Sequence, residues 1–327
     1  MHLYNIINLE IRSVTKDVLL IHQKETPYYF SCCDGLIILP KKHRNEQSIV
    51  LDLNIEPRLI DKIESYYGPF SNYVCTHGHM DHMAHVHHWE SLGVKIHAPI
   101  PENTYLLDLY NFYTGFGFNE QLDYNFIEKF AKNNKYQPCK YLKAFKPGDT
   151  LKFEQFYVET IPFKGHSRGH IGFFLPSEKL LHISCLGFDQ PKPGLDGFGP
   201  WYGFNECSIT QYQEDIDLAE EIFLKRAKYL TSSHSYIVEN PDITPFSYMR
   251  RKIAEKQVII DQAIKSHKLR YEGENNIDYL LDLDLFFPKK KLKGYIVELY
   301  KYWEQNIINK HLQKSNYSLN DYKSKSS

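Results

Sequence analysis

The residues of this chain best suited to chemistry lie in one histidine-rich segment, THGHMDH, which ends at His82. Within it His77, His79, Asp81 and His82 follow the spacing H-x-H-x-D-H. Imidazole nitrogens and carboxylate oxygens are ordinary ligands of zinc and of other first-row metals. In an extended loop, residues 77 and 79 place two imidazoles on the same side. Asp81 and His82 can then reach a second metal position beside the first, so the pattern predicts a metal site.

The alternative interpretation of this segment is a solvated loop that is merely rich in histidine. The chain has 16 histidines, so some clustering is expected. We interpret His85, His87 and His88 as bystanders of that kind. The spacing H-x-H-x-D-H is far more specific than a lone histidine, and it favours the metal site.

The same order and spacing resemble those of the metallo-β-lactamase-fold hydrolases, whose signature is H-x-H-x-D-H followed by three further ligands downstream. Segment 163–170, FKGHSRGH, resembles the P-G-H-T-x-G segment of that family and places His166 at the third ligand of the first metal. Lys164 stands where proline is usual. His234 matches the final ligand, although Ser233 replaces the glycine that usually precedes it.

The position between these two ligands departs from the family pattern. In ungapped members the metal-bridging aspartate lies 19 residues after the histidine, and counting from His166 reaches Cys185. A thiolate is a good zinc ligand, and one zinc β-lactamase subgroup has cysteine at this position. Alternatively, Cys185 is a small buried residue, and the second metal is held by Asp189 or is absent. We favour Cys185 because counting to it requires no gap.

The resemblance thus implies two groups of metal ligands. The first metal is held by three imidazoles, those of His77, His79 and His166. The second is held by a mixed group, consisting of Asp81, His82, Cys185 and His234. The expected cofactor is a pair of zinc ions, with iron or manganese as alternatives, and Asp81 is expected also to orient or receive a proton during catalysis.

Asp52 is a candidate for supporting these ligands. In the family a strand ends in aspartate at this place, usually followed closely by glycine, whereas Leu53 and Asn54 follow here. Two interpretations stay open: Asp52 supports a metal ligand, or it is a surface aspartate at the end of a strand.

Short apolar runs divided by polar turns predict the strands that must position the ligands. A strand at 70–75 should lead directly into the metal loop. Proline near the start and glycine just past the end delimit a helix at 56–67. Further strands are expected at 18–21, 35–39, 49–53, 94–98, 148–153, 156–162, 171–175, 180–184 and 229–233, and a helix at 209–227.

The resemblance extends over residues 15–238 and implies an α/β fold, a four-layer αββα sandwich with the metal cleft at one edge of its two sheets. We therefore expect a catalytic domain at 1–238. Pro241 and Pro245 mark the start of a helical C-terminal appendage at 239–327, with helices near 246–267, 276–285 and 290–313.

Two aromatic segments are candidates for contact with substrate. Residues 102–139 form an insertion crowded with tyrosine and phenylalanine, which we interpret as a partial lid with an apolar wall over the metal cleft. In the loop 197–203, Trp201 and Tyr202 could contact substrate, and the tyrosine hydroxyl could donate a hydrogen bond to a developing oxyanion. Ordinary packing of both segments is the alternative.

Composition restricts the class of protein further. The chain has 327 residues, 42% hydrophobic and 15% aromatic, enough for one large domain with an appendage. A net charge of −1 gives no overall field that favours nucleic acid or an anionic membrane. There is no secretory pattern and no run of about 18 apolar residues. The six cysteines form neither C-x-x-C pairs nor a disulfide scaffold, so we expect a cytoplasmic protein with reduced thiols.

The expected function is that of a metal-dependent hydrolase acting on a carboxylic ester, thioester or lactone, resembling the glyoxalase II and lactonase-like branch of the family. The aromatic insertion and the near-neutral charge favour a small-molecule substrate with an apolar portion. The alternatives are a phosphodiesterase or ribonuclease, for which the lysine run at 288–293 is the only local support, a mononuclear iron dioxygenase and a non-catalytic binding protein. Whether the chain forms a homodimer stays open.

Overall fold

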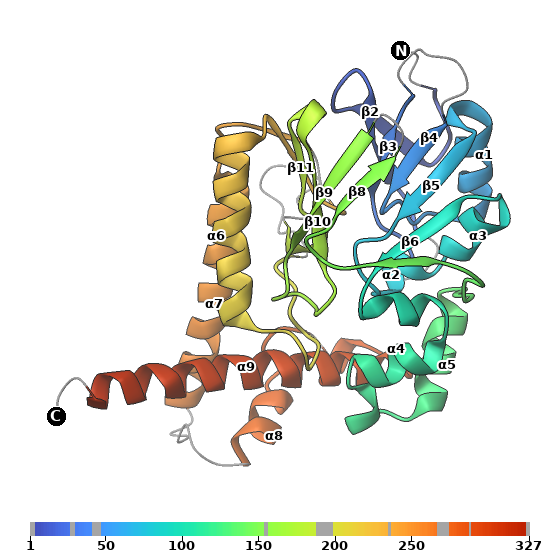
Figure 1. The fold of residues 1–327 in the computed structure, drawn as a ribbon. Coiled ribbons are helices and arrows are strands. Elements are labelled where there is room, and N and C mark those ends of the chain that lie inside the picture. The colour runs from blue at the N-terminus through green and yellow to red at the C-terminus, as the bar shows by residue number, and fades with distance from the viewer. Residues whose placement is uncertain are drawn as a thin grey trace.

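Two β-sheets packed face to face form the centre of the molecule, and helices cover their outer faces (Figure 1). This computed structural model describes residues 4–26, 30–40, 47–153, 156–187, 199–234, 237–266, 275–287 and 289–324. The layers follow the order helix, sheet, sheet, helix, which confirms the predicted αββα sandwich.

The first sheet has seven strands in sequence order. Its first half is an antiparallel meander, and β4 to β7 run parallel to one another. Helices or longer segments must connect parallel neighbours, and this is where α1, the metal loop and the aromatic insertion are placed. The strands are β1 (Leu9–Ser13), β2 (Val18–Gln23), β3 (Gly35–Ile38), β4 (Ser48–Leu51), β5 (Phe70–Val74), β6 (Lys95–Pro99) and β7 (Lys143–Phe145).

The second sheet has six strands, in the order β13-β12-β11-β10-β9-β8. All neighbours in it are antiparallel except β11 and β12, which the long helix α6 connects. The strands are β8 (Thr150–Phe153), β9 (Phe156–Pro162), β10 (Ile171–Leu175), β11 (Leu180–His182), β12 (Tyr229–Thr231) and β13 (Val238–Glu239). The strand predicted at 180–184 ends early, because Ser184 has a φ of 48° and begins the 3-10 turn η4 (Ser184–Leu186).

The sheet strands are apolar on both faces because each face meets another layer. In β2, Val18 and Leu20 pack between the two sheets, whereas Leu19 and Ile21 belong to the outer core under the helices. Fully burying one such side chain contributes about 1.5–3 kcal/mol. The short continuous apolar runs seen in the sequence therefore mark buried strands rather than half-exposed ones.

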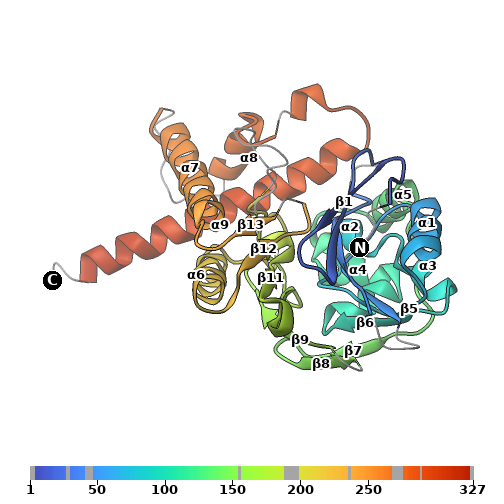
Figure 2. The same ribbon diagram turned by 90° about the horizontal axis from the view of Figure 1, so that it is seen from above.

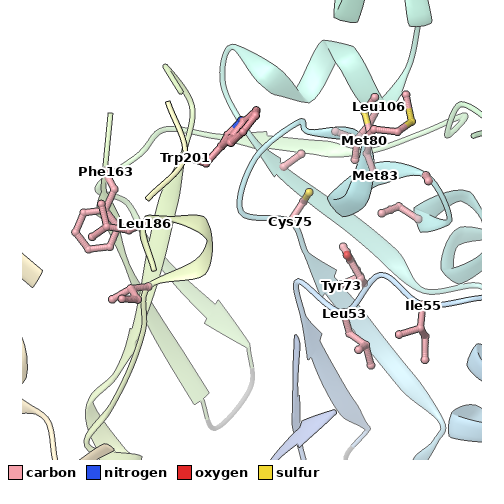
Figure 3. Close-up of a cluster of buried hydrophobic side chains, with 14 of the residues drawn as sticks. Leu53, Ile55, Tyr73, Cys75, Met80, Met83, Leu106, Phe163, Leu186 and Trp201 are labelled. Atoms are coloured by element: carbon pink, nitrogen blue, oxygen red, sulfur yellow. The ribbon is translucent and has the colours of Figure 1, made fainter. Parts of the chain in front are cut away.

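Helices on the two outer faces complete the sandwich. On the first sheet lie α1 (Pro57–Tyr67) and α3 (Val86–Ser91), preceded by the single turn α2 (Met80–Met83); on the second lie α6 (Ile209–Arg226) and α7 (Thr244–Ser266) (Figures 1 and 2). Figure 3 shows buried side chains of the two halves, with Leu53 and Tyr73 on one side and Phe163 and Leu186 on the other.

The insertion and the C-terminal region lie together at one end of the sandwich (Figure 1). The insertion contains η1 (Glu102–Leu106), α4 (Leu109–Gly115), η2 (Phe118–Glu120) and α5 (Tyr124–Asn133). The C-terminal region adds α8 (Asn275–Asp282), η5 (Lys289–Lys291) and α9 (Ile296–Ser324), which is longer than predicted. Tyr302 of α9 packs on Phe118 of the insertion, with ring centroids 5.0 Å apart. Among the described helices, none is long and apolar enough to cross a membrane.

Candidate metal centre

The predicted ligands are carried by loops that meet at one edge of the two sheets. His77 and His79 follow β5, and Asp81 and His82 lie on the single turn α2. The remaining ligands come from the second sheet: His166 from the loop between β9 and β10, Cys185 from η4 after β11, and His234 from the turn after β12. Strand ends are rigid supports, so side chains that follow them are held in place by the sheet hydrogen bonds.

The first group of ligands is formed by three buried imidazoles. His166 Nε2 lies 3.0 Å from His79 Nδ1 and 3.3 Å from His77 Nε2. All three residues are at most 5% exposed. The structure thus brings together the three histidines that the sequence assigned to the first metal.

The hydrogen bonds around His166 show that this arrangement suits a cation. His166 Nδ1 lies 2.7 Å from the carbonyl oxygen of Trp201. A carbonyl oxygen can only accept, so Nδ1 carries a proton, and in the neutral imidazole Nε2 then presents its lone pair to the other two histidines. Burial lowers the pKa of His77 and of His79 well below 6.5, so both are neutral at pH 7. Converging neutral nitrogens are the donor set that zinc prefers.

The second group combines a thiol, two imidazoles and a carboxylate. Cys185 Sγ lies 3.0 Å from His82 Nε2 and 3.3 Å from His234 Nε2. Asp81 Oδ2 lies 3.3 Å from His234 Nε2 and 3.6 Å from His82 Nε2. The ligand atoms of these four residues all lie within 4.8 Å of one another, a spacing that could hold a metal ion.

Cys185 lies between the two groups. Its Sγ is also within 4.8 Å of the ligand nitrogens of His77 and His166, so the thiol lies close to the first group as well. Burial raises the pKa of the Cys185 thiol, but His82 and His234 outweigh it and leave this pKa well below its ordinary value. The thiolate is the form that binds metals. The alternative ligand, Asp189, lies outside the described residues.

Asp52 supports His82 from behind. Its Oδ2 accepts a hydrogen bond from His82 Nδ1 at 2.9 Å, which leaves His82 Nε2 facing Cys185. Asp52 is 0% exposed, so the surface interpretation is wrong. Burial raises its pKa, but His82 and the surrounding donors lower it overall. Carboxylates that fix a ligand histidine in this way are common behind metals.

The structure gives a reason for Ser233, which replaces the glycine that usually precedes the final ligand. Its hydroxyl donates to Asp52 Oδ2 at 2.9 Å, and Thr76 Oγ1 donates to the same oxygen at 2.7 Å. A glycine before His234 could not make this bond. Serine at this position therefore helps keep the Asp52 carboxylate ionised and aimed at His82.

We expect Asp52→Asn to weaken the second metal by about 10–100-fold, because the amide cannot hold His82 in the same tautomer and orientation. Asp61→Asn is a matched control, since Asp61 also pairs with a histidine, His88 at 2.7 Å, but on the exposed surface of α1 and α3. Titration of the metal-free proteins with metal measures the affinity of the second site in both variants. Equal affinities in Asp52→Asn and wild type would contradict this role.

Several solved structures share this architecture. A beta-lactamase domain protein from Burkholderia ambifaria aligns with a TM-score of 0.64, over 94% of this chain and 89% of that chain, at 12% identity. A metallo-beta-lactamase family protein from Thermus thermophilus gives a TM-score of 0.58, over 89% and 91%, at 14% identity. DIM-1 metallo-beta-lactamase gives 0.51, over 76% and 97%, at 19% identity. The chain has the metallo-β-lactamase fold.

At identities this low, the likeness establishes the fold and leaves the substrate to be argued from the site. No family model matches the sequence, and no curated protein matches it. The site itself keeps the arrangement of two adjacent ligand groups at the sheet edge.

An aromatic pocket opens directly onto the ligands of this metallo-β-lactamase fold. His79, Asp81, His166 and Cys185 line one side of it. The other walls are apolar and come from the aromatic insertion, the C-terminal helix α9 and two loops; the rings are those of Phe30, Phe112, Phe118, Phe130, Trp201, Phe204 and Trp303. Three phenylalanines of the insertion, Phe112, Phe118 and Phe130, thus line the same pocket as the candidate ligands.

Trp201 and Tyr202, the two aromatic residues predicted to contact substrate, are placed differently. Trp201 lines the pocket. Tyr202 does not line it: its side chain is 0% exposed and its hydroxyl lies 2.9 Å from Nε2 of His311 on α9. The structure therefore favours the packing interpretation for Tyr202.

Residues that the sequence analysis missed lie in segments far from the motif. Phe30 precedes β3, and Trp303 lies on α9; their rings meet in a T-shaped contact with centroids 5.0 Å apart. Neither segment carries a local pattern that points to the site. A third missed residue, Glu102, contacts both loops that carry the first ligand group.

Proposed function

We propose that this protein is a dinuclear metal-dependent hydrolase of a carboxylic ester, thioester or lactone with an apolar portion. The observation that carries the proposal is the aromatic pocket that opens onto both ligand groups. Among the described residues that line it, no lysine or arginine occurs, and the charged or ionisable groups are those of the metal ligands. Such a pocket suits an uncharged, apolar part of a substrate.

Two zinc ions in this centre would supply Lewis acidity toward the scissile carbonyl and a hydroxide nucleophile near neutral pH. The chain's own residues would do the rest. Asp81 lines the pocket with its side chain 13% exposed, so its carboxylate can ligate and can also orient or receive a proton. The rings of Trp201 and Phe204 would hold the apolar portion and exclude bulk water.

The described residues give less support to the alternatives. In the lysine run that favoured a phosphodiesterase or ribonuclease, Lys289 is 7% exposed and paired with Glu304 and Asp284, whereas the other three lysines are exposed. A mononuclear iron dioxygenase would not need the second ligand group. A non-catalytic binding protein would not need either group, nor the supporting contacts of Asp52.

We also propose a cytoplasmic location. The support for it is the state of the six cysteines, which are all buried and free of disulfide bonds. The expected partner is the small-molecule substrate, and nucleic acid and membrane are not proposed as partners. A homodimer stays a prediction.

We expect the purified protein to contain about two metal ions per chain, mostly zinc, because two adjacent groups of suitable ligands are present. Elemental analysis measures this. In a panel of aryl esters, thioesters, lactones and bis(4-nitrophenyl) phosphate, we expect the carboxylic substrates with an apolar portion to be turned over fastest. One iron per chain and no zinc would contradict the proposal, and preferential cleavage of the phosphodiester would favour the alternative.

A further inference from the structure

Glu102 is a buried carboxylate at the start of the aromatic insertion, and it bridges two loops of the metal centre. Its side chain belongs to the turn η1 and is 0% exposed. Oε2 accepts a hydrogen bond from the backbone N–H of Gly78 at 2.6 Å, and Oε1 accepts one from the backbone N–H of Gly169 at 2.6 Å. One side chain thus holds two backbone segments that are distant in sequence.

These two segments carry the whole first ligand group. Gly78 lies between His77 and His79, and Gly169 lies in the same loop as His166. The two N–H bonds therefore fix how far apart the two loops sit. That separation decides whether the third imidazole reaches the other two.

The glycines show how closely Glu102 and its neighbour fit between the loops. A Cβ at Gly78 would lie 2.6 Å from Cδ2 of Tyr105 and 3.2 Å from Cβ of Glu102. A Cβ at Gly169 would lie 3.0 Å from Cγ of Glu102. Close approach of the carboxylate to both backbones is possible because neither residue has a side chain.

The hydrogen bonds of Glu102 suit this role. Both of its oxygens accept from N–H donors, so the ionised form matches the site better than the protonated one. Burial raises the pKa of Glu102 overall, although the hydroxyl of Ser167 and the bonds from Gly78 and Gly169 oppose that rise. Hydrogen bonds from N–H groups to a carboxylate are stronger than those between neutral groups. A glutamine at this position would turn an N–H₂ donor toward one of the two N–H groups.

Asp215 offers a comparison within the same molecule. Its Oδ2 accepts from the N–H of Gly165 at 2.7 Å, directly before His166. That bond ties the His166 loop to helix α6 but does not reach the His77 loop. Glu102, by contrast, bonds to both loops.

We propose that Glu102 is a positioning residue for the first metal ion, holding the His77–His79 loop and the His166 loop at the separation that the ion requires. Because Glu102 begins the insertion that forms the pocket wall, the same contact ties that wall to the metal centre. The proposal rests on the metal centre described above and not on any particular substrate.

The test is a cobalt titration of the metal-free full-length protein carrying Glu102→Gln. Absorption in the visible range reports cobalt in both sites, and a thiolate charge-transfer band in the near ultraviolet reports cobalt bound to Cys185. Because Cys185 also lies near the first group, the band is calibrated on His166→Ala, in which the first ligand group is incomplete. We expect the first site to be weakened by about 10–100-fold, as for other residues that orient metal ligands. The affinity measured through the thiolate band should change by less than about threefold, within the context dependence of such effects.

Glu90→Gln is the matched control. Glu90 accepts backbone N–H bonds from Lys140 and Tyr141 at the other end of the insertion and touches neither ligand loop. Glu90→Gln should leave the cobalt affinities of both sites at wild-type values. Circular dichroism and thermal unfolding of the metal-free proteins show whether each variant folds. Should Glu102→Gln not fold, Glu102→Asp, which keeps the charge on a shorter side chain, is titrated in its place.

Unchanged affinity of the first site, or an equal loss at both sites, would overturn the proposal. The outcome is separable from that of the proposed function. A selective loss in a protein that hydrolyses nothing in the panel would support the role of Glu102 and contradict the hydrolase. Hydrolysis by a Glu102→Gln protein with wild-type cobalt affinities would support the hydrolase and contradict the role of Glu102.

Discussion

Replacing His166 by alanine is expected to abolish turnover and to lower the metal content from about two ions to about one. The imidazole is one of only three nitrogens in the first ligand group, and its Nε2 lies within 3.3 Å of the other two. Its loss leaves two nitrogens, too few to hold zinc against water. The variant also deprives the carbonyl oxygen of Trp201 of its hydrogen bond, so the wall of the pocket should loosen.

His88→Ala is the control for this variant. His88 lies on α3, and its Nε2 pairs with Asp61 at the surface, 2.7 Å away. Metal content and turnover should stay at wild-type values. His85 is a poorer control, because it is 1% exposed and its replacement would leave a cavity. Loss of metal from His88→Ala, or two ions retained in His166→Ala, would show that the ligands have been assigned wrongly.

Replacing Cys185 by serine is expected to weaken the second metal most strongly, because a neutral hydroxyl is a poor substitute for a thiolate. Sγ lies 3.0 Å from His82 Nε2 and 3.3 Å from His234 Nε2, so the thiolate occupies the centre of that group. Cys185→Asp should restore much of the binding, since it recreates the residue that the family usually has here. Equilibrium titration with zinc measures the affinity of the second site in wild type, Cys185→Ser and Cys185→Asp.

Cobalt substitution distinguishes ligation of the second metal by the Cys185 thiolate from ligation by Asp189. If Cys185 is a ligand, the cobalt protein shows an intense charge-transfer band in the near ultraviolet, and Asp189→Asn changes the metal content little. If Asp189 is the ligand, the pattern inverts: Asp189→Asn empties the second site and Cys185→Ser leaves it full. Two bound cobalt ions without the band would rule out thiolate ligation.

The sequence by itself determined which residues are candidate ligands where the signal is local. The H-x-H-x-D-H spacing follows a strand and enters a helical turn, so residue types and spacing were enough to predict the first four ligands. His166 and His234 were predicted only from the resemblance of their segments to ligand positions of the family. The spacing of 19 residues from His166 that the resemblance implies pointed to Cys185, and the structure places its Sγ beside the other candidate ligands.

For two residues the sequence left two interpretations open, and the structure was needed to choose between them. Asp52 and Tyr202 each had two interpretations, and neighbours far along the chain separated them. Asp52 is buried against His82 and Ser233, and Tyr202 is buried against His311. A strand-end aspartate or a loop tyrosine has the same local sequence whether it faces solvent, a metal ligand or a helix.

Only the tertiary structure decided what surrounds the metals. Phe30 and Trp303 come from opposite ends of the chain and meet in one pocket wall, and Glu102 joins two loops from different sheets. None of these residues belongs to a motif, because a motif records spacing along the chain. Their roles depend on distances set by sheet packing and by the course of α9, so they could not be predicted from neighbouring residues. The sequence determined which groups could bind metal, and packing determined how they are held and what they face.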